Sequence, residues 1–220
     1  MAKKIKITRK ELLKEPDQFL SSTEKAMLFF TKNRAAVVGS FLIILAAGIS
    51  YLGYENYISS KIMQNEALYF NMLEVAKKEG KETEELLKIH DQIEQGSQRN
   101  RASLLLADIY FKNNDYDKAQ ETYKGILKIS QGLNHHMATI GLAYTYEAKG
   151  DYKNAISLYK SVVDTKTSFP LFQVYWSLAR CYANDKDKSN ALLILREMQI
   201  KFSGTAELEK IDRQIKQLST

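Results

Sequence analysis

The sequence ADIYFKNNDYDKAQETYKGIL, residues 107–127, returns in altered form 36 residues later and again 36 residues after that. The later copies are AYTYEAKGDYKNAISLYKSVV, residues 143–163, and ARCYANDKDKSNALLILREMQ, residues 179–199. Each copy starts with Ala, has Tyr three residues on, then a polar breaker, and a second Ala twelve residues after the first. A polar breaker between two apolar stretches predicts a tight turn between helices, and small residues permit close helix packing. The pattern therefore predicts three helical hairpins and an all-α fold.

This order of small residue, Tyr, turn Asp-Tyr, Ala and aromatic resembles the tetratricopeptide repeat, over residues 100–205. Two features depart from that family. The usual Trp near the start of the first helix is replaced by Ser103, Thr139 and Tyr175, and the third copy has Lys188 in place of the turn Tyr. The resemblance implies a helical solenoid of three repeats.

Both ends of a solenoid expose an apolar face that needs a cover. Residues 206–220 are predicted to form a C-terminal capping helix, with Thr205 as its N-cap. Residues 55–99 are predicted to form a linker helix and a degenerate helical hairpin, in which Gly80 breaks one helix and Thr83 caps the next.

The segment AAVVGSFLIILAAGISYLGY, residues 35–54, carries no charge. Twenty helical residues span the roughly 30 Å hydrocarbon core of a bilayer, so the segment is predicted to be a single N-terminal transmembrane helix. A cleaved signal peptide is the alternative, because Ala46, Ala47 and Gly48 are small enough for a signal peptidase. The long preceding segment and the length of the apolar run favour an uncleaved anchor.

The basic charges lie mainly before this segment. Residues 1–34 hold nine Lys or Arg and four acidic residues, whereas residues 55–74 hold Lys61 alone among basic groups. This asymmetry predicts a basic cytoplasmic tail, with the repeats on the far side of the membrane. In a bacterium this would be the inner membrane, with a periplasmic repeat domain. The tail contributes +5 of the total +6, so the rest of the chain does not indicate a nucleic-acid partner.

Within the tail, Ser21 and Glu24 have capping-box spacing. A helix is therefore expected to begin there and to run directly into the span. Its aromatic and basic residues suit a helix lying at the cytoplasmic interface, and a purely topogenic basic tail is the alternative.

Catalytic motifs are absent from the sequence, which has no GxSxG, no phosphate-binding glycine loop and no HExxH. His135 and His136 are adjacent, so on a helix their side chains diverge by about 100° and do not suggest a metal site. The single cysteine, Cys181, is expected to be a buried structural thiol. We therefore expect a protein that is not an enzyme and has no cofactor.

In tetratricopeptide repeat proteins the inner face of the stacked first helices holds peptides or partner segments. The resemblance places this groove at Arg101, Leu104, Asp108, Phe111 and Lys112 in the first repeat, Met137, Ile140, Tyr144 and Glu147 in the second, and Gln173, Trp176, Arg180 and Asn184 in the third. Phe111, Tyr144 and Trp176 are expected to be the apolar anchors, because aromatic and Arg residues dominate interface hot spots. Packing of Trp176 against a neighbouring helix is the alternative.

The layout of a basic tail, one span and a small repeat domain resembles the YfgM-type ancillary subunits of the Sec translocon. That resemblance implies translocon subunits and periplasmic chaperones as partners. Two alternatives stay open: a coordinator of envelope or division machinery, and an organelle import receptor whose repeats face the cytosol.

Overall fold

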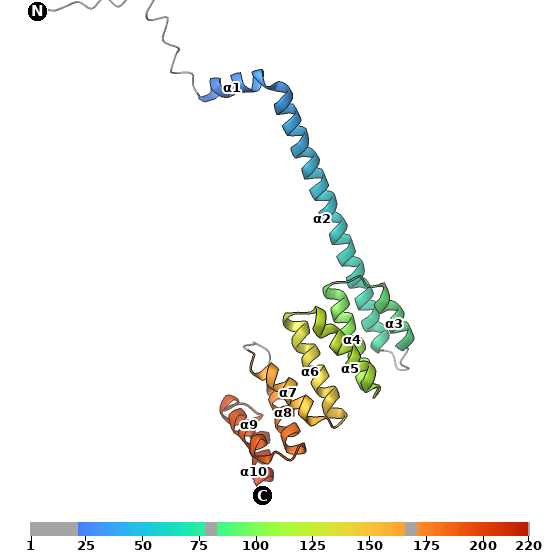
Figure 1. The fold of residues 1–220 in the computed structure, drawn as a ribbon, viewed down its shortest axis with the longest axis vertical. Coiled ribbons are helices and arrows are strands. Elements are labelled where there is room, and N and C mark those ends of the chain that lie inside the picture. Colours follow the sequence, from blue (N-terminus) through green and yellow to red (C-terminus); the bar gives the residue numbers. More distant parts are fainter. Residues whose placement is uncertain (1–21, 78–82, 166–170, 220) are drawn as a thin grey trace, which may run out of the picture. The chain divides into compact units, whose positions relative to one another are not determined.

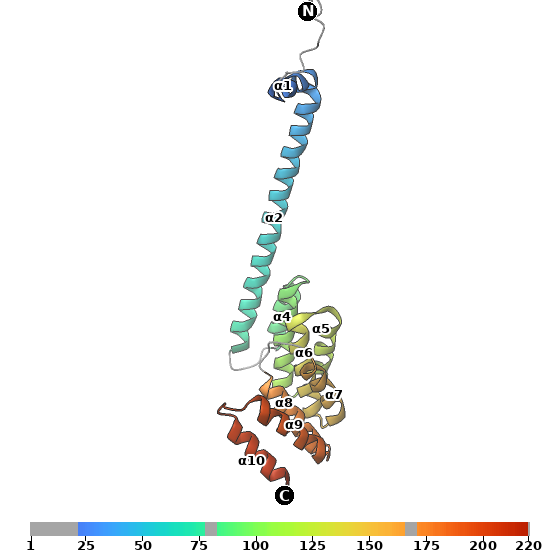
Figure 2. The same ribbon diagram turned by 90° about the vertical axis from the view of Figure 1, so that its left-hand side faces the viewer.

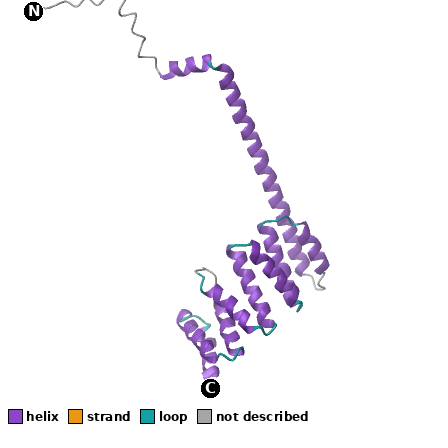
Figure 3. Ribbon diagram, viewed as in Figure 1, coloured by secondary structure: helices purple, strands orange, loops and turns teal. Residues whose placement is uncertain are grey.

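The structure is a computed structural model that describes residues 22–77, 83–165 and 171–219. Over these ranges all regular secondary structure is helical (Figure 3). The chain divides into two compact units, residues 1–60 and residues 61–220. The helices, labelled in Figure 1, are α1 (Ser22–Lys32), α2 (Arg34–Lys77), α3 (Thr83–Gln92), α4 (Ser97–Lys112), α5 (Tyr116–Ile129), α6 (Gly132–Ala148), α7 (Tyr152–Val163), α8 (Phe172–Asn184), α9 (Lys188–Lys201) and α10 (Leu208–Ser219).

The first unit contains α1 and the first part of α2, which are separated by Asn33. The expected uninterrupted helix is therefore wrong, and the chain changes direction between α1 and α2 (Figure 1). The side chains of Thr31 and Asn33 explain the bend: Thr31 Oγ1 donates to the carbonyls of Met27 and Leu28, and Asn33 Nδ2 donates to the carbonyl of Phe29. Such side chains compete for helix carbonyls and bend helices. Ser21, the predicted cap, lies outside the described residues.

Among the described helices, only α2 is long and apolar enough to cross a membrane. The apolar window that meets this criterion has no buried residue, which distinguishes it from the core helix of a soluble protein. A signal sequence near the N-terminus would meet the same criterion.

The second unit contains the three predicted hairpins, α4–α5, α6–α7 and α8–α9, which are confirmed (Figure 1). Their turns have the same backbone geometry. One residue in each turn has a left-handed conformation: Asn114 at φ 60°, Gly150 at φ 76° and Lys186 at φ 67°. The amide after it donates to the carbonyl of the repeat tyrosine five residues earlier, at 2.9 Å in all three turns. This pairing is a Schellman motif, which ends each first helix.

The second helix of each hairpin begins in the same way. Asp115, Asp151 and Asp187 are the N-caps, and each carboxylate accepts a bond from the backbone amide three residues later. The distances are 3.4, 3.3 and 3.1 Å. A carboxylate also favours the positive end of the helix dipole. The third hairpin keeps this cap although its turn Tyr has been replaced, which explains why the repeat survives that change.

The core of the repeats lies where the sequence pattern placed it. The repeat alanines are buried, and the large residues four positions after the second alanine, Tyr123, Tyr159 and Leu195, are buried with them. Between the first two repeats, Gly141 of α6 lies against the ring of Tyr123 of α5. A Cβ atom at Gly141 would be 2.7 Å from the tyrosine hydroxyl and closer still to ring carbons. Only glycine fits at this position.

Both ends of the repeat stack are covered. At the amino-terminal end, Met72 and Val75 of α2 share a core with Leu86 and Ile89 of α3 and with buried residues of α4. The helix α3 begins at Thr83 itself, and Gly80 lies outside the described residues.

At the carboxyl-terminal end, α10 packs beside α9 (Figure 2). Ile211 of α10 is fully buried in the core that the two helices share. The predicted cap at Thr205 is wrong, because α10 begins only at Leu208. The hydroxyl of Thr205 donates to the carbonyl of Phe202 at 2.9 Å, so it stabilises the preceding turn instead.

Candidate functional site

A pocket of about 200 Å³ lies on the last repeat, among α8, α9 and α10. Three of the predicted groove residues, Trp176, Arg180 and Asn184, line it together because they are spaced four residues apart on α8. The opposite side comes from Gln214 and Leu218 of α10. The remaining lining residues are Ala179, Ala183 and Leu195. The sequence indicated α10 only as a cover, and its role as a pocket wall was missed because helix pairing is not encoded locally.

Trp176 has both of the environments that the sequence left open. Its ring stacks on Phe172 at a centroid distance of 6.1 Å and an interplanar angle of 15°. The ammonium of Lys210, on α10, lies 4.2 Å from the Trp176 ring centroid, which is a cation–π geometry. The indole is therefore held by packing while part of it faces the pocket. A fixed aromatic ring with a cation beside it is suited to bind a ligand in which an apolar side chain lies next to an acidic group.

An ion pair joins the second and third repeats. Arg180 Nε donates to Glu147 Oε1 at 2.5 Å, and Arg180 Nη2 donates to Glu147 Oε2 at 3.1 Å. Glu147 also accepts a bond from the Tyr159 hydroxyl at 3.0 Å, and its side chain is only 11% exposed. The guanidinium is half-exposed, so the pair fixes its orientation at the edge of the pocket.

The surroundings of the Arg180–Glu147 ion pair raise the pKa values of three groups. Burial, and then the negative charge of Glu147, raise the pKa of the Tyr159 hydroxyl. The hydrogen bond to Glu147 raises the pKa of Arg180. Burial raises the pKa of the Cys181 thiol to about 12, and the thiol is fully buried, as expected. All three groups therefore keep their protons at neutral pH, which suits a fixed polar network and not a reactive thiol.

The other two predicted anchors lie elsewhere. Tyr144 packs edge-on against Tyr159 at 5.6 Å between centroids, and Phe111 packs against Tyr116 at 5.6 Å. Phe111, Tyr144 and Trp176 pack against three different core clusters. The physical reason is the repeat register: Trp176 is equivalent to Ile140, while Tyr144 is equivalent to Arg180, one helical turn further along. The three rings therefore lie on the same side of the first helices of their repeats, but at different positions along the helix axes.

In the first repeat, most predicted groove residues are engaged within the chain. Arg101 pairs with Glu66 of α2 at 2.9 and 3.1 Å, and its guanidinium lies 4.1 Å from the Tyr69 ring centroid. Asp108 accepts a bond from the Tyr123 hydroxyl, and burial raises the pKa of this carboxyl. Leu104 is buried and Lys112 is exposed.

The remaining predicted positions are Met137 and Gln173, which are exposed, and Ile140, which is partly buried against the core of the second repeat. His135 lies in the first turn of α6, where its Nδ1 is 3.2 Å from the carbonyl oxygen of Ser130. Among the residues that the structure describes, no group of three His, Cys, Asp or Glu is placed to hold a metal ion.

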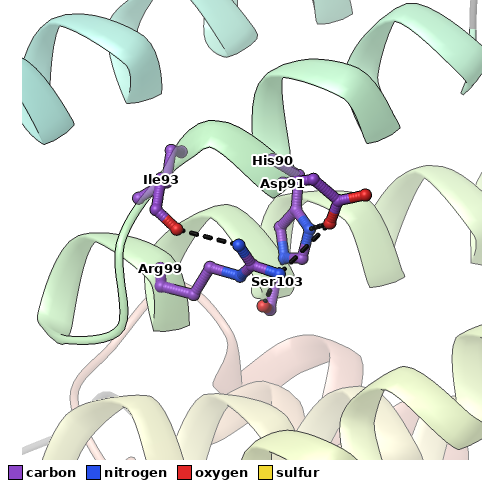
Figure 4. Close-up of polar contacts among 5 residues, drawn as sticks. All are labelled: His90, Asp91, Ile93, Arg99 and Ser103. Carbon is purple, nitrogen blue, oxygen red and sulfur yellow. Dashed lines mark hydrogen bonds and ion pairs between the residues drawn. The ribbon is translucent and has the colours of Figure 1, made fainter.

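A polar cluster that the sequence did not single out joins α3 to α4 (Figure 4). His90 Nε2 lies 2.8 Å from Ser103 Oγ, and His90 Nδ1 lies 3.2 Å from Asp91 Oδ1. Arg99 donates to the same Asp91 oxygen at 3.2 Å and to the carbonyl of Ile93 at 2.8 Å. Although Ser, His and Asp are the residue types of a hydrolytic triad, the bonds here serve to tie α3 and its following loop to α4. We interpret the cluster as a structural clamp.

Comparison with solved structures supports the fold. Two crystal structures of the nearly identical TPR-like repeats of a Podosopora anserina protein named as a kinesin light chain, one of them a single-residue variant, are similar to this chain. Each has a TM-score of 0.54 and 17% sequence identity, and the match covers 73% of this chain and 84% of the other. Identity this low shows the fold alone.

Comparison at the sequence level gives a family and no individual relative. No curated protein matches the chain. A family model described as a tetratricopeptide repeat-like domain matches residues 28–170, more than half of the chain, and this range includes the first two hairpins. The chain therefore belongs to the tetratricopeptide repeat-like family.

Proposed function

We propose that this protein is a membrane-anchored scaffold whose repeat domain binds segments of other proteins. The observation that carries the proposal is the pocket on the last repeat, which is lined by a fixed tryptophan and a half-exposed arginine, with a lysine over the tryptophan ring. Aromatic and arginine residues around a pocket are the usual composition of a binding hot spot. The ligand that fits is a peptide segment with one large apolar side chain and an adjacent acidic residue.

The proposed anchor is α2, with residues 1–34 in the cytoplasm and the repeats in the periplasm of a bacterium. Support comes from the unburied apolar window of α2 and from the excess of basic residues before it. In this setting the partners are translocon subunits and periplasmic chaperones, and the protein acts as an ancillary factor of the Sec translocon. The absence of catalytic motifs in the sequence supports binding over catalysis.

Photo-crosslinking in membranes tests the pocket. A photoreactive amino acid at Asn184, which lines the pocket, should capture a discrete partner, whereas the same group at the exposed Lys160 of α7 should not. In the chain that carries this group, Ala183→Trp should fill the hollow and Trp176→Ala should remove its wall. Loss of a hot-spot side chain costs about 2 kcal/mol or more, so either change should weaken capture by about thirtyfold.

The matched control is Lys160→Trp, which adds the same ring on the exposed side of α7 and should leave capture unchanged. Mass spectrometry of the captured protein decides whether it is a translocon subunit or a chaperone. Undiminished capture by both pocket variants, with unchanged circular dichroism, would contradict the proposed site.

Topology is tested separately. Alkaline phosphatase fused after residue 220 should be active and should remain with the membrane fraction, because that enzyme is active only outside the cytoplasm. An inactive fusion would favour an import receptor with cytosolic repeats. A soluble active fusion would mean that the apolar segment is a cleaved signal peptide.

A further inference from the structure

The helix α1 exposes its apolar side chains. Met27 is 70% exposed and Phe30 is 53% exposed, and their neighbours Leu28 and Phe29 are exposed as well. Four consecutive large apolar residues in water are unfavourable unless something covers them. Within the described part of the first unit, residues 22–60, no segment packs over them.

The charges of α1 are arranged on one side of it. Lys25 and Lys32 are seven residues apart, about two helical turns, and so share a face. Met27 and Phe30 lie on the opposite side, by the same periodicity. The only acidic residue of α1 is Glu24. By the same periodicity Leu28 and Phe29 lie within about 60° of the two lysines, so apolar side chains surround α1 while its lysines share one side. Lysine stems can extend past neighbouring apolar side chains, so a short helix of this kind is suited to the boundary between lipid headgroups and acyl chains.

The junction with α2 supplies the third observation. The bend at Asn33 forms an open hollow that is lined by Ala26, Met27, Phe30, Thr31 and Arg34. Its lining is almost entirely apolar, with one guanidinium at the edge. This is the chemistry of a phospholipid, in which a phosphate lies directly above acyl chains.

We propose that α1 and its junction with α2 form a binding surface for anionic phospholipids, with α1 lying along the surface of the leaflet. This rests on the proposed anchoring by α2. The helix that follows Asn33 enters the bilayer, so α1 is held at headgroup level by its covalent continuity. Met27 and Phe30 then contact the acyl boundary, Lys25 and Lys32 extend to the headgroups, and Arg34 binds a lipid phosphate in the hollow.

Depth-dependent fluorescence quenching of the full chain in nanodiscs tests this. The single native tryptophan is replaced by Trp176→Phe, and one reporter is introduced at a time. Phe30→Trp should be blue-shifted and quenched by lipids that are brominated near the headgroup. Lys32→Trp, two residues along and therefore about 200° around the helix, should be quenched much less. Leu45→Trp, within the apolar segment, should be quenched by deeply brominated lipids.

The tryptophan reporters distinguish failure of the α1 surface from failure of the membrane anchor. If Leu45→Trp is quenched and Phe30→Trp is not, the anchor stands and the α1 surface is overturned. If neither is quenched, the proposed anchor itself fails. Equal quenching of Phe30→Trp and Lys32→Trp would show that α1 is inserted without the proposed orientation, which also overturns the surface.

The lipid class is tested with nanodiscs of phosphatidylcholine with and without phosphatidylglycerol. Phosphatidylglycerol should be enriched in lipid that co-purifies with the full chain. Replacing Lys25, Lys32 and Arg34 by Gln should lower this enrichment by about fivefold for each charge removed. Enrichment that is unchanged in the triple variant would overturn anionic lipid as the partner. Thr165→Gln, an exposed change in the second unit, is the matched control and should leave the enrichment unchanged.

Discussion

The hairpins from α4 to α9 are stabilised by contacts that occur three times, whereas the helices that precede them are held in place by contacts that occur once. Every hairpin turn has the same left-handed residue, the same Schellman bonds and the same aspartate cap. The amino-terminal helices instead use individual ion pairs, Lys61 with Glu94 at 2.5 Å and Arg101 with Glu66 at 2.9 Å. The difference is one of range: the repeated contacts join residues three to five apart, and the single ones join residues 33 and 35 apart.

The largest expected effect tests the repeated part. Gly141→Ala places a methyl group against the buried ring of Tyr123, whose hydroxyl is held by Asp108, so the ring has no room to move. Overpacking a tight interface costs about 1 to 3 kcal/mol, and we expect the upper end here. Thermal unfolding of the full chain in detergent, followed by circular dichroism, measures the loss.

The matched control is Gly125→Ala on α5, where a Cβ atom would meet nothing within 4 Å. This change should stabilise the protein by about 0.5 to 1 kcal/mol, because glycine weakens helix interiors. If Gly141→Ala and Gly125→Ala changed the stability in the same direction, the described packing of α5 on α6 would be incorrect.

The short-range contacts explain how much of the fold could be predicted. The positions of Ala107, Tyr110 and Asp115 relative to one another are enough to predict a helix, a turn and a second helix, and the same holds in the other copies. The bend at Asn33 was missed because it depends on which carbonyls the side chains of Thr31 and Asn33 select. The start of α10 was missed because Thr205 and its surroundings allow a turn or a cap equally well.

The candidate site was predictable in part, for the same reason. Helical spacing alone brings Trp176, Arg180 and Asn184 to one face of α8, and the structure places all three around the pocket. The contribution of Lys210 and Gln214 depends on how α10 packs, which involves long-range contacts. Arg101 was assigned to a groove because the repeat pattern cannot reveal that Glu66, on a helix outside the repeats, binds it.

A smaller effect is expected from the turns. Lys186 has a left-handed conformation, which costs a residue with a side chain about 1 kcal/mol and costs glycine almost nothing. Lys186→Gly should therefore stabilise the chain by about 1 kcal/mol. Gly150→Ala, at the equivalent position of the second repeat, should destabilise it by a similar amount. Chemical unfolding in urea measures both, and opposite signs in the two turns are the expected result. Two changes of the same sign would show that the turns are not equivalent.

The smallest effect is expected in the amino-terminal part and depends on pH. Burial, followed by the charge of Arg99, lowers the pKa of His90 below its usual value of about 6.5. The unfolded chain therefore binds a proton at His90 at a higher pH than the folded chain does. Stability from this group is fully present above about pH 6.5 and is lost as the pH falls through the lower, folded pKa.

Melting temperatures at about pH 7 and about pH 5 should show this loss, and it should be absent in His90→Gln. Arg99→Gln removes a positive charge that disfavours protonated His90, so this variant should lose less stability on acidification than the native chain does. The repeats offer a comparison within the same molecule: amide exchange in α3 should accelerate at the lower pH relative to exchange in α6, because His90 joins α3 to Ser103 of α4. Equal acceleration in both helices would mean that the amino-terminal helices and the repeats unfold as one cooperative unit. The two regions would then differ in the kind of contact that holds them and not in their stability.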